Sequence, residues 1–202
     1  MSETNSHDHG HVHERVDDSV DAHDDWARRR RKGIPTDERL LVVACMDERI
    51  PVEEALGIEL GDAQIYRNAG GKVTDDVVRS AALTTQFFDT EEIIVVNHTD
   101  CGMMSAPDDA VVEGLEAAAG GDLDDVDLDP ALPGLSIGDA SVADWVRMTD
   151  DIDEACAAQV RYLEEHPLVD AEVNGYVYEV ESGTLRYPGG RVAEEISTRV
   201  ED

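Results

Sequence analysis

The chain has 202 residues, with 47 acidic against 16 basic side chains and a formal net charge of −31 at pH 7. This length suits one α/β domain with a sizeable core. Such an acidic surface repels DNA, RNA and anionic lipid, so we expect no nucleic-acid or membrane partner. The sequence has no apolar run long enough to span a bilayer and no basic-then-apolar export signal at its start, which predicts a cytoplasmic protein.

The acidic excess is typical of proteins that work at high internal salt. At molar salt the Debye length is only about 3 Å, so repulsion between carboxylates is screened while the hydrated surface stays soluble. We therefore expect a halophilic protein. The three cysteines cannot form a disulfide framework, which agrees with a reducing compartment.

Residues 1–13 carry alternating histidines at His7, His9, His11 and His13. They could collect metal or carry protons, but we prefer a disordered tail without an essential role. Residues 14–33 predict a helical arm, because acidic residues come early and the basic run 28–32 comes late, before Gly33. That run could also contact nucleic acid, but ion pairing with acidic surface is the simpler interpretation.

From residue 34 onward the pattern predicts strands at 40–44, 63–67 and 92–97, separated by helical segments at 51–57 and 74–88. Strands that alternate with helices indicate a central, mostly parallel sheet flanked by helices. Helix 74–88 should bury Val77, Val78, Ala81, Leu83 and either Phe87 or Phe88. Because parallel strands end at one edge, residues that follow the strands 40–44 and 92–97 can converge there if the two strands are neighbours.

Residues 105–140 form an acidic insertion with one predicted helix at 108–119, and its aspartates lack the spacing of an EF-hand calcium loop. A long helix is expected at 141–165, where Cys156 lies on the apolar stripe and is interpreted as a core residue. The other members of that stripe are Val142, Trp145, Val146, Ile152, Ala155, Val160 and Leu163. The chain then predicts a C-terminal hairpin from 173–180 and 184–187.

Soft metal ligands stand at the ends of two of these strands. Cys45 follows the first apolar run, and His98 and Cys101 follow the run at 92–97. Two thiolates and one imidazole suit Zn²⁺, and three protein ligands leave a tetrahedral ion one free position for chemistry. A structural zinc site would be closed by a fourth protein ligand. Taken singly, the cysteine and the histidine could be ordinary buried residues.

Asp47 and Arg49 follow the first ligand closely. The Asp47 carboxylate could complete the zinc tetrahedron or accept a hydrogen bond from a zinc-bound water. Arg49 offers a planar fork of donors that would hold this carboxylate ionised and oriented. The two residues alone could equally form an ordinary salt bridge in a turn.

The pattern Cys-x-Asp-x-Arg at 45–49 and His-x-x-Cys at 98–101 resembles the β-class carbonic anhydrases, in their compact subgroup. The resemblance extends over 38–105 and includes the segments 61–71, 74–77 and 101–103. It implies a Rossmann-like β-carbonic anhydrase domain over 34–202, a Zn²⁺ cofactor, and reversible hydration of CO2 to bicarbonate and a proton by zinc-bound hydroxide. It also implies a homodimer or a larger homo-oligomer.

Two other functions fit the same motifs. Carbonyl sulfide and carbon disulfide are small linear molecules like CO2, so a hydrolase acting on them could use the same zinc site. A non-enzymatic zinc-binding or bicarbonate-sensing protein would result if Asp47 permanently filled the fourth position.

Overall fold

The computed structural model describes residues 36, 38–104, 108–123, 146 and 151–189, all of them within the unit Pro35–Asp202. The predicted tail 1–13 and arm 14–33 lie outside the described residues. Residues 124–145 also lie outside them, and these include the end of the predicted insertion 105–140 and the start of the predicted helix 141–165.

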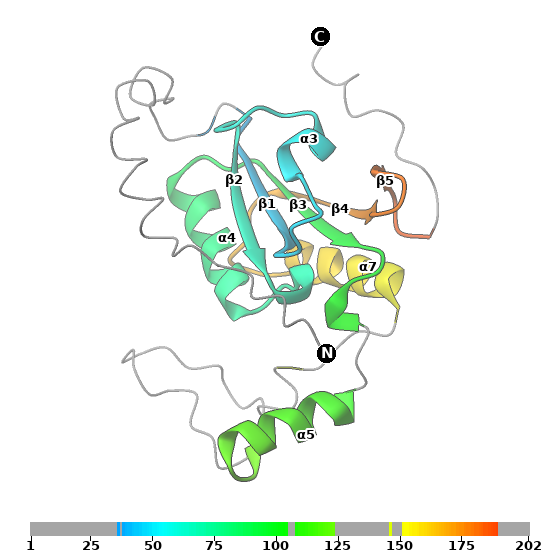
Figure 1. Cartoon of the computed structure of the whole chain (residues 1–202). Coiled ribbons are helices and arrows are strands. Elements are labelled where there is room, and N and C mark those ends of the chain that lie inside the picture. The colour runs from blue at the N-terminus through cyan, green and yellow to red at the C-terminus, as the bar shows by residue number, and fades with distance from the viewer. Residues whose placement is uncertain (1–35, 37, 105–107, 124–145, 147–150, 190–202) are drawn as a thin grey trace, which may run out of the picture. The chain divides into compact units, whose positions relative to one another are not determined.

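The described chain builds one five-stranded sheet, in the order β2-β1-β3-β4-β5 (Figure 1). The first four of these strands are parallel, and β5 pairs antiparallel with β4. This confirms the mostly parallel sheet and the terminal hairpin. The strands are β1 (Leu40–Cys45), β2 (Ala63–Asn68), β3 (Glu92–His98), β4 (Glu172–Glu179) and β5 (Thr184–Arg186).

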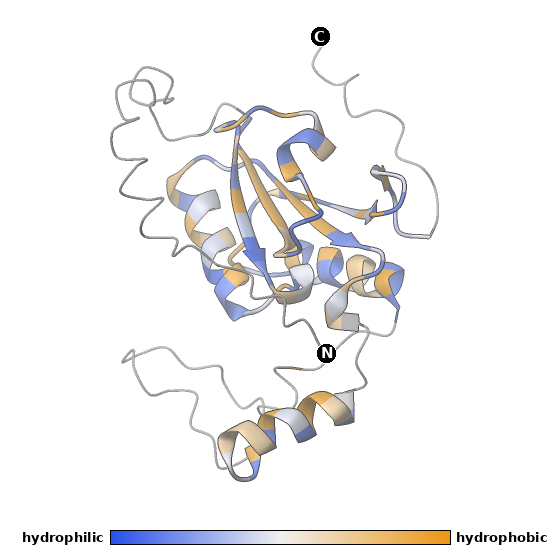
Figure 2. Cartoon of the chain, viewed as in Figure 1, coloured by the Kyte–Doolittle hydropathy of each residue, from blue (hydrophilic) through white to orange (hydrophobic). Residues whose placement is uncertain are grey.

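Helices cover both faces of the sheet, because alternate residues of each strand point to opposite sides. Leu40 and Val42 pack with α3 residues, whereas Leu41 and Val43 pack with residues of α4 and α7. Figure 2 shows β1 and β3 as largely apolar strands between these layers. The helices are α3 (Val52–Leu56), α4 (Asp75–Phe87), α5 (Asp108–Ala119) and α7 (Ile152–Glu164), with 3₁₀ turns η1 (Ala69–Gly71) and η2 (Gly102–Met104).

The predicted buried face of α4 was partly wrong. Val77, Val78 and Ala81 are buried as expected, but the last inward position is Thr84. Thr84 lies three residues beyond Ala81 and so shares its face, as the 3.6-residue period requires. The predicted Leu83 is exposed, as are Phe87, which is 72% exposed, and the C-cap residue Phe88.

The predicted helix 141–165 is not continuous, because α7 begins only at Ile152. Asp151 has extended backbone angles and caps the helix, since its side chain accepts hydrogen bonds from the backbone N–H groups of Asp153 and Glu154. Cys156 and Leu163 are buried as predicted. No helix in the described part of the chain is both long enough and apolar enough to cross a membrane.

Candidate active site

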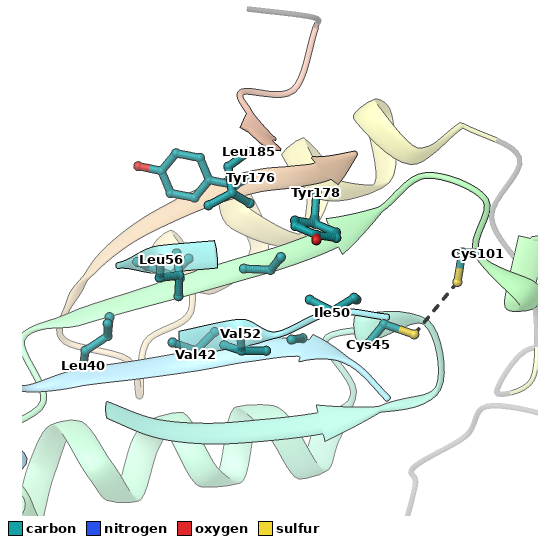
Figure 3. Close-up of a cluster of buried hydrophobic side chains, with 13 residues drawn as sticks. Leu40, Val42, Cys45, Ile50, Val52, Leu56, Cys101, Tyr176, Tyr178 and Leu185 are labelled. Atoms are coloured by element: carbon teal, nitrogen blue, oxygen red, sulfur yellow. Dashed lines mark hydrogen bonds between the residues drawn. The ribbon is translucent and has the colours of Figure 1, made fainter. Parts of the chain in front are cut away.

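The expected metal ligands converge at one edge of the sheet. Cys45 is the last residue of β1 and His98 the last residue of β3, and these strands are parallel neighbours. Cys101 lies three residues further on, and its Sγ is 3.9 Å from Cys45 Sγ (Figure 3). The ligand atoms of all three side chains lie within 4.8 Å of one another, and all three residues are buried.

The tautomer of His98 leaves one ring nitrogen free to bind a metal. Nδ1 lies 2.9 Å from the carbonyl oxygen of Thr99, and since a carbonyl can only accept, Nδ1 carries the hydrogen. Nε2 therefore presents a lone pair, and this buried atom has no hydrogen-bond partner among the described residues. A buried lone pair beside two thiols fits a Zn²⁺ ion, whose histidine ligands are oriented in this way by a backbone carbonyl.

The two thiols at the site differ in acidity. The hydrogen bond from Cys101 lowers the pKa of Cys45 to about 4 despite burial. The same hydrogen bond, together with burial, raises the pKa of Cys101. Without a metal the pair therefore holds one thiolate and one thiol. A bound cation would release the second proton, because metal binding favours deprotonated sulfur.

Asp47 lies beside the ligand cluster and is held there by Arg49. Arg49 Nε donates to Asp47 Oδ1 at 2.9 Å, and Nη2 donates to Oδ2 at 2.8 Å. The backbone N–H of Arg49 also donates to Oδ1 at 2.9 Å. Asp47 Oδ2 is 3.9 Å from His98 Nε2. The hydrogen bonds from Arg49 hold the pKa of Asp47 well below its usual value, so the carboxylate is ionised at neutral pH.

Two further residues at the site were not singled out from the sequence. Asp100 accepts hydrogen bonds from Arg49, and Arg67 donates to the backbone oxygens of Cys45 and Asp47. A signal existed for Asp100, which stands inside the second ligand motif. Arg67 lies on β2, within the segment that carries the family resemblance, but nothing local identifies its distant backbone partners.

Gly71 allows the loop after β2 to pack directly on Cys45. A Cβ atom added at Gly71 would lie 2.8 Å from the backbone nitrogen of Cys45 and 3.0 Å from the carbonyl oxygen of Val96. Gly71 also has a φ of 59°, which residues other than glycine rarely adopt. The loop can therefore approach the metal-ligand edge only with glycine at this position.

A carbonic anhydrase family model matches residues 40–185. Carbon disulfide hydrolase of Acidithiobacillus thiooxidans is 49% identical over 189 residues, which cover 92% of this chain and 94% of that protein. β-carbonic anhydrase 1 of Mycobacterium tuberculosis is 34% identical over 154 residues, or 75% of this chain and 83% of that one. A solved apo form of carbon disulfide hydrolase superposes with a TM-score of 0.69 at 45% identity, covering 87% of this chain and 91% of that structure.

The described residues form a mostly parallel sheet with a Cys-His-Cys cluster at its carboxyl edge, a donor set that suits a metal ion. The chain belongs to the β-carbonic anhydrase family. The family resemblance and the fold expected from the motifs are thereby confirmed. The comparisons leave the substrate open, since one relative is named for carbon disulfide and another for carbonic anhydrase activity.

Proposed function

We propose that this chain is a zinc-dependent hydrolase of carbon disulfide. The motifs alone led us to expect CO2 as the substrate, with carbon disulfide as an alternative. The observation that now favours carbon disulfide is the 49% identity, over 92% of the chain, to an enzyme named for that reaction. The chemistry balances as CS2 plus H2O giving COS plus H2S, followed by COS plus H2O giving CO2 plus H2S.

We infer that Cys45, His98 and Cys101 hold the Zn²⁺ ion. This assignment is supported by the spacing of their ligand atoms, all within 4.8 Å, and by Nε2 of His98, which has no hydrogen-bond partner in the part of the chain that the structure describes. Zinc bound there would lower the pKa of a water molecule to about 7, which would make a hydroxide nucleophile available at neutral pH. The general example of this effect is itself a carbonic anhydrase. That nucleophile could attack the central, electrophilic carbon of a linear substrate.

Asp47 and Arg49 would orient that nucleophile. The Asp47 carboxylate lies close enough to the ligand cluster to accept a hydrogen bond from water at the fourth position. Arg49 engages both carboxylate oxygens, which keeps Asp47 ionised and directs it. If Asp47 instead moved onto the metal, it would displace the water and close the site. The fork of Arg49 opposes this movement.

Hydration of CO2 is the second candidate. The family model and the Mycobacterium tuberculosis relative, 34% identical, favour it. CO2, COS and CS2 all present an electrophilic carbon between two double-bonded atoms, so the same residues could serve each. A non-enzymatic zinc-binding or bicarbonate-sensing role has less support, because both relatives are named as enzymes.

We also propose a cytoplasmic homodimer or larger homo-oligomer. Several large apolar side chains remain exposed on the described surface, of which Phe87 is 72% and Met46 61% exposed. A second copy of the chain could cover such side chains. Light scattering in molar KCl would measure the mass, and a monomer at micromolar concentration would contradict the oligomer.

Turnover of CS2 and CO2 by one zinc-loaded preparation tests the function. We expect release of H2S from CS2, with Cys45→Ser as the inactive control. Proton release from CO2 at about pH 8 to 9 in molar salt is measured in parallel. Activity on CO2 alone would select the second candidate. Inactivity towards both, with one zinc per chain, would point to a binding role.

A further inference from the structure

Arg49 joins the two loops that carry the metal ligands. In the loop after β1 it binds Asp47, and in the loop after β3 it binds Asp100. Arg49 Nη1 donates to Asp100 Oδ2 at 2.7 Å, and Nη2 donates to the backbone oxygen of Asp100 at 2.8 Å. The guanidinium therefore links residues 51 positions apart across the site.

These contacts divide the donors of the guanidinium between the two aspartates. Asp47 takes Nε and one hydrogen of Nη2, while Asp100 takes Nη1 and the other hydrogen of Nη2. A guanidinium has five N–H donors in a rigid plane, so four of them are engaged here. Because both edges of the plane are held, the guanidinium cannot rotate about its hydrogen bonds to Asp47. Asp47 alone would fix only one edge.

Because Asp100 is exposed, we expect its contact with Arg49 to affect the site nearby more than the stability of the whole fold. Its side chain is 79% exposed, compared with 13% for Asp47. Exposed ion pairs add little to the stability of a fold because water and salt screen them. The contact can still set the orientation of Arg49, since both the side chain and the backbone of Asp100 accept hydrogen bonds from it.

The backbone of Asp100 makes the position well suited to substitution. Its φ is 52°, in the left-handed region that asparagine, aspartate and glycine accept more readily than other residues. Asp100→Asn and Asp100→Gly therefore alter the side chain without adding backbone strain. Asp89 has the same φ of 52° and lies before β3, at the opposite end of that strand, so Asp89→Gly is a matched control.

We propose that Asp100 is a positioning residue that holds Arg49 so that Asp47 stays beside the metal position and does not move onto it. Asp100 acts through its contacts with Arg49. This inference rests on the proposed function, because the orientation of Asp47 matters for the reaction only if water is activated at the site.

The test compares kcat and KM of zinc-loaded variants on CS2 and CO2. Asp100→Gly should lower kcat about fivefold, the effect of one exposed ion pair, with KM unchanged. Asp100→Asn should recover part of the loss, because its amide oxygen still accepts from Arg49. Asp89→Gly should match the wild type. Equal kcat values for Asp100→Gly and Asp89→Gly would overturn the proposal.

A double-mutant cycle tests whether Asp100 acts through Arg49. In the Arg49→Ala background, Asp100→Gly should have no further effect, because residues that work through one contact are not additive. An undiminished fivefold loss in that background would overturn the proposal. Loss of zinc from Asp100→Gly would do the same, since Asp100 would then support the ligand loop itself.

The absorption spectrum of the Co²⁺-substituted protein provides a readout that does not depend on turnover. Asp100→Gly and Arg49→Ala should shift the Co²⁺ bands in the same direction, because both release Asp47 towards the metal. Asp89→Gly should leave the bands in place, and an unchanged spectrum in Asp100→Gly would overturn the proposal. If the wild type turns over neither substrate, the proposed function fails, while these spectra still decide the role of Asp100.

Discussion

Gln159 on α7 donates a hydrogen bond from Nε2 to Asn97 Oδ1 at 3.0 Å. Asn97 Nδ2 in turn donates to the carbonyl oxygens of Gly70 and Gly71, at 2.9 and 3.2 Å. Asn97 directly precedes His98, and Gly71 packs on Cys45. This buried network therefore connects α7 with both strands that carry the proposed metal ligands.

Asn97→Ala should destabilise the protein by about 2 kcal/mol, because it leaves buried carbonyl groups without a donor. Asn97 is only 2% exposed, so water cannot easily replace the amide. The measurement is the free energy of unfolding in denaturant. Asn174→Ala is the control, since its partners Glu92 and Glu172 lie nearer the surface, and it should cost less than about 0.5 kcal/mol. Equal losses would contradict the importance of the network.

Gly71→Ala should cost more stability than Gly57→Ala. Both glycines have positive φ, so both variants carry a backbone penalty of about 1 kcal/mol. A Cβ at Gly57 meets nothing within 4 Å, whereas one at Gly71 meets the backbone of Cys45. We expect about 2 kcal/mol of additional loss and weaker zinc binding in Gly71→Ala only. Unfolding curves and zinc titrations would show this, and similar values for the two variants would argue against close packing.

Replacement of any proposed ligand should remove zinc and activity together. We expect Cys45→Ser, His98→Ala and Cys101→Ser to bind much less than one zinc per chain by elemental analysis. Cys156→Ser is the control. Burial raises the pKa of Cys156 to about 12, and its Sγ lies beside backbone oxygens in the core. A Cys156→Ser protein without zinc, or a Cys45→Ser protein that retains it, would refute the ligand assignment.

The pH dependence of activity should come from water and not from Asp47. Arg49 holds the pKa of Asp47 below its unfolded value of about 3.9. The stabilisation from this carboxylate is therefore complete above that pH and is lost only as the pH falls towards the lowered pKa. Asp47 stays ionised between about pH 6.5 and 9. We expect wild-type kcat/KM to rise over this range as the nucleophile forms.

The Asp47 and Arg49 variants test the same pair of residues. Asp47→Asn should lower kcat/KM about 100-fold and Arg49→Ala about 10-fold, with zinc still bound. Both profiles are measured between about pH 6.5 and 9. Full activity of either zinc-loaded variant would exclude the proposed role of the pair.

Stability should increase with salt. The chain has 47 acidic residues, and in dilute buffer their repulsion extends over about 30 Å, compared with about 3 Å at molar salt. We expect thermal unfolding midpoints to rise from low to multimolar KCl. A midpoint that stays constant or falls would argue against a halophilic protein.

Local sequence predicted the elements whose residues form long apolar runs or strict periods. The first three strands begin where expected, and each extends one residue further, so that Cys45 and His98 belong to the strands themselves. Helix α5 has the predicted bounds. These results follow because strand and helix signals come from residues close together in the chain. The convergence of Cys45, His98 and Cys101 could also be predicted, since cysteine and histidine stand at strand ends that a parallel sheet brings to one edge.

Tertiary contacts decided the remainder. The start of α7 depends on the cap at Asp151, and the outward side of Leu83 depends on which face of α4 meets the sheet. The partners of Arg49 and Arg67 come from segments 51 and 22 residues away. The sequence alone predicted that Cys45, His98 and Cys101 stand at the ends of parallel strands, where the structure places them. Only the folded chain determined which distant backbone and carboxylate oxygens those arginines bind, because long side chains reach partners that local patterns do not encode.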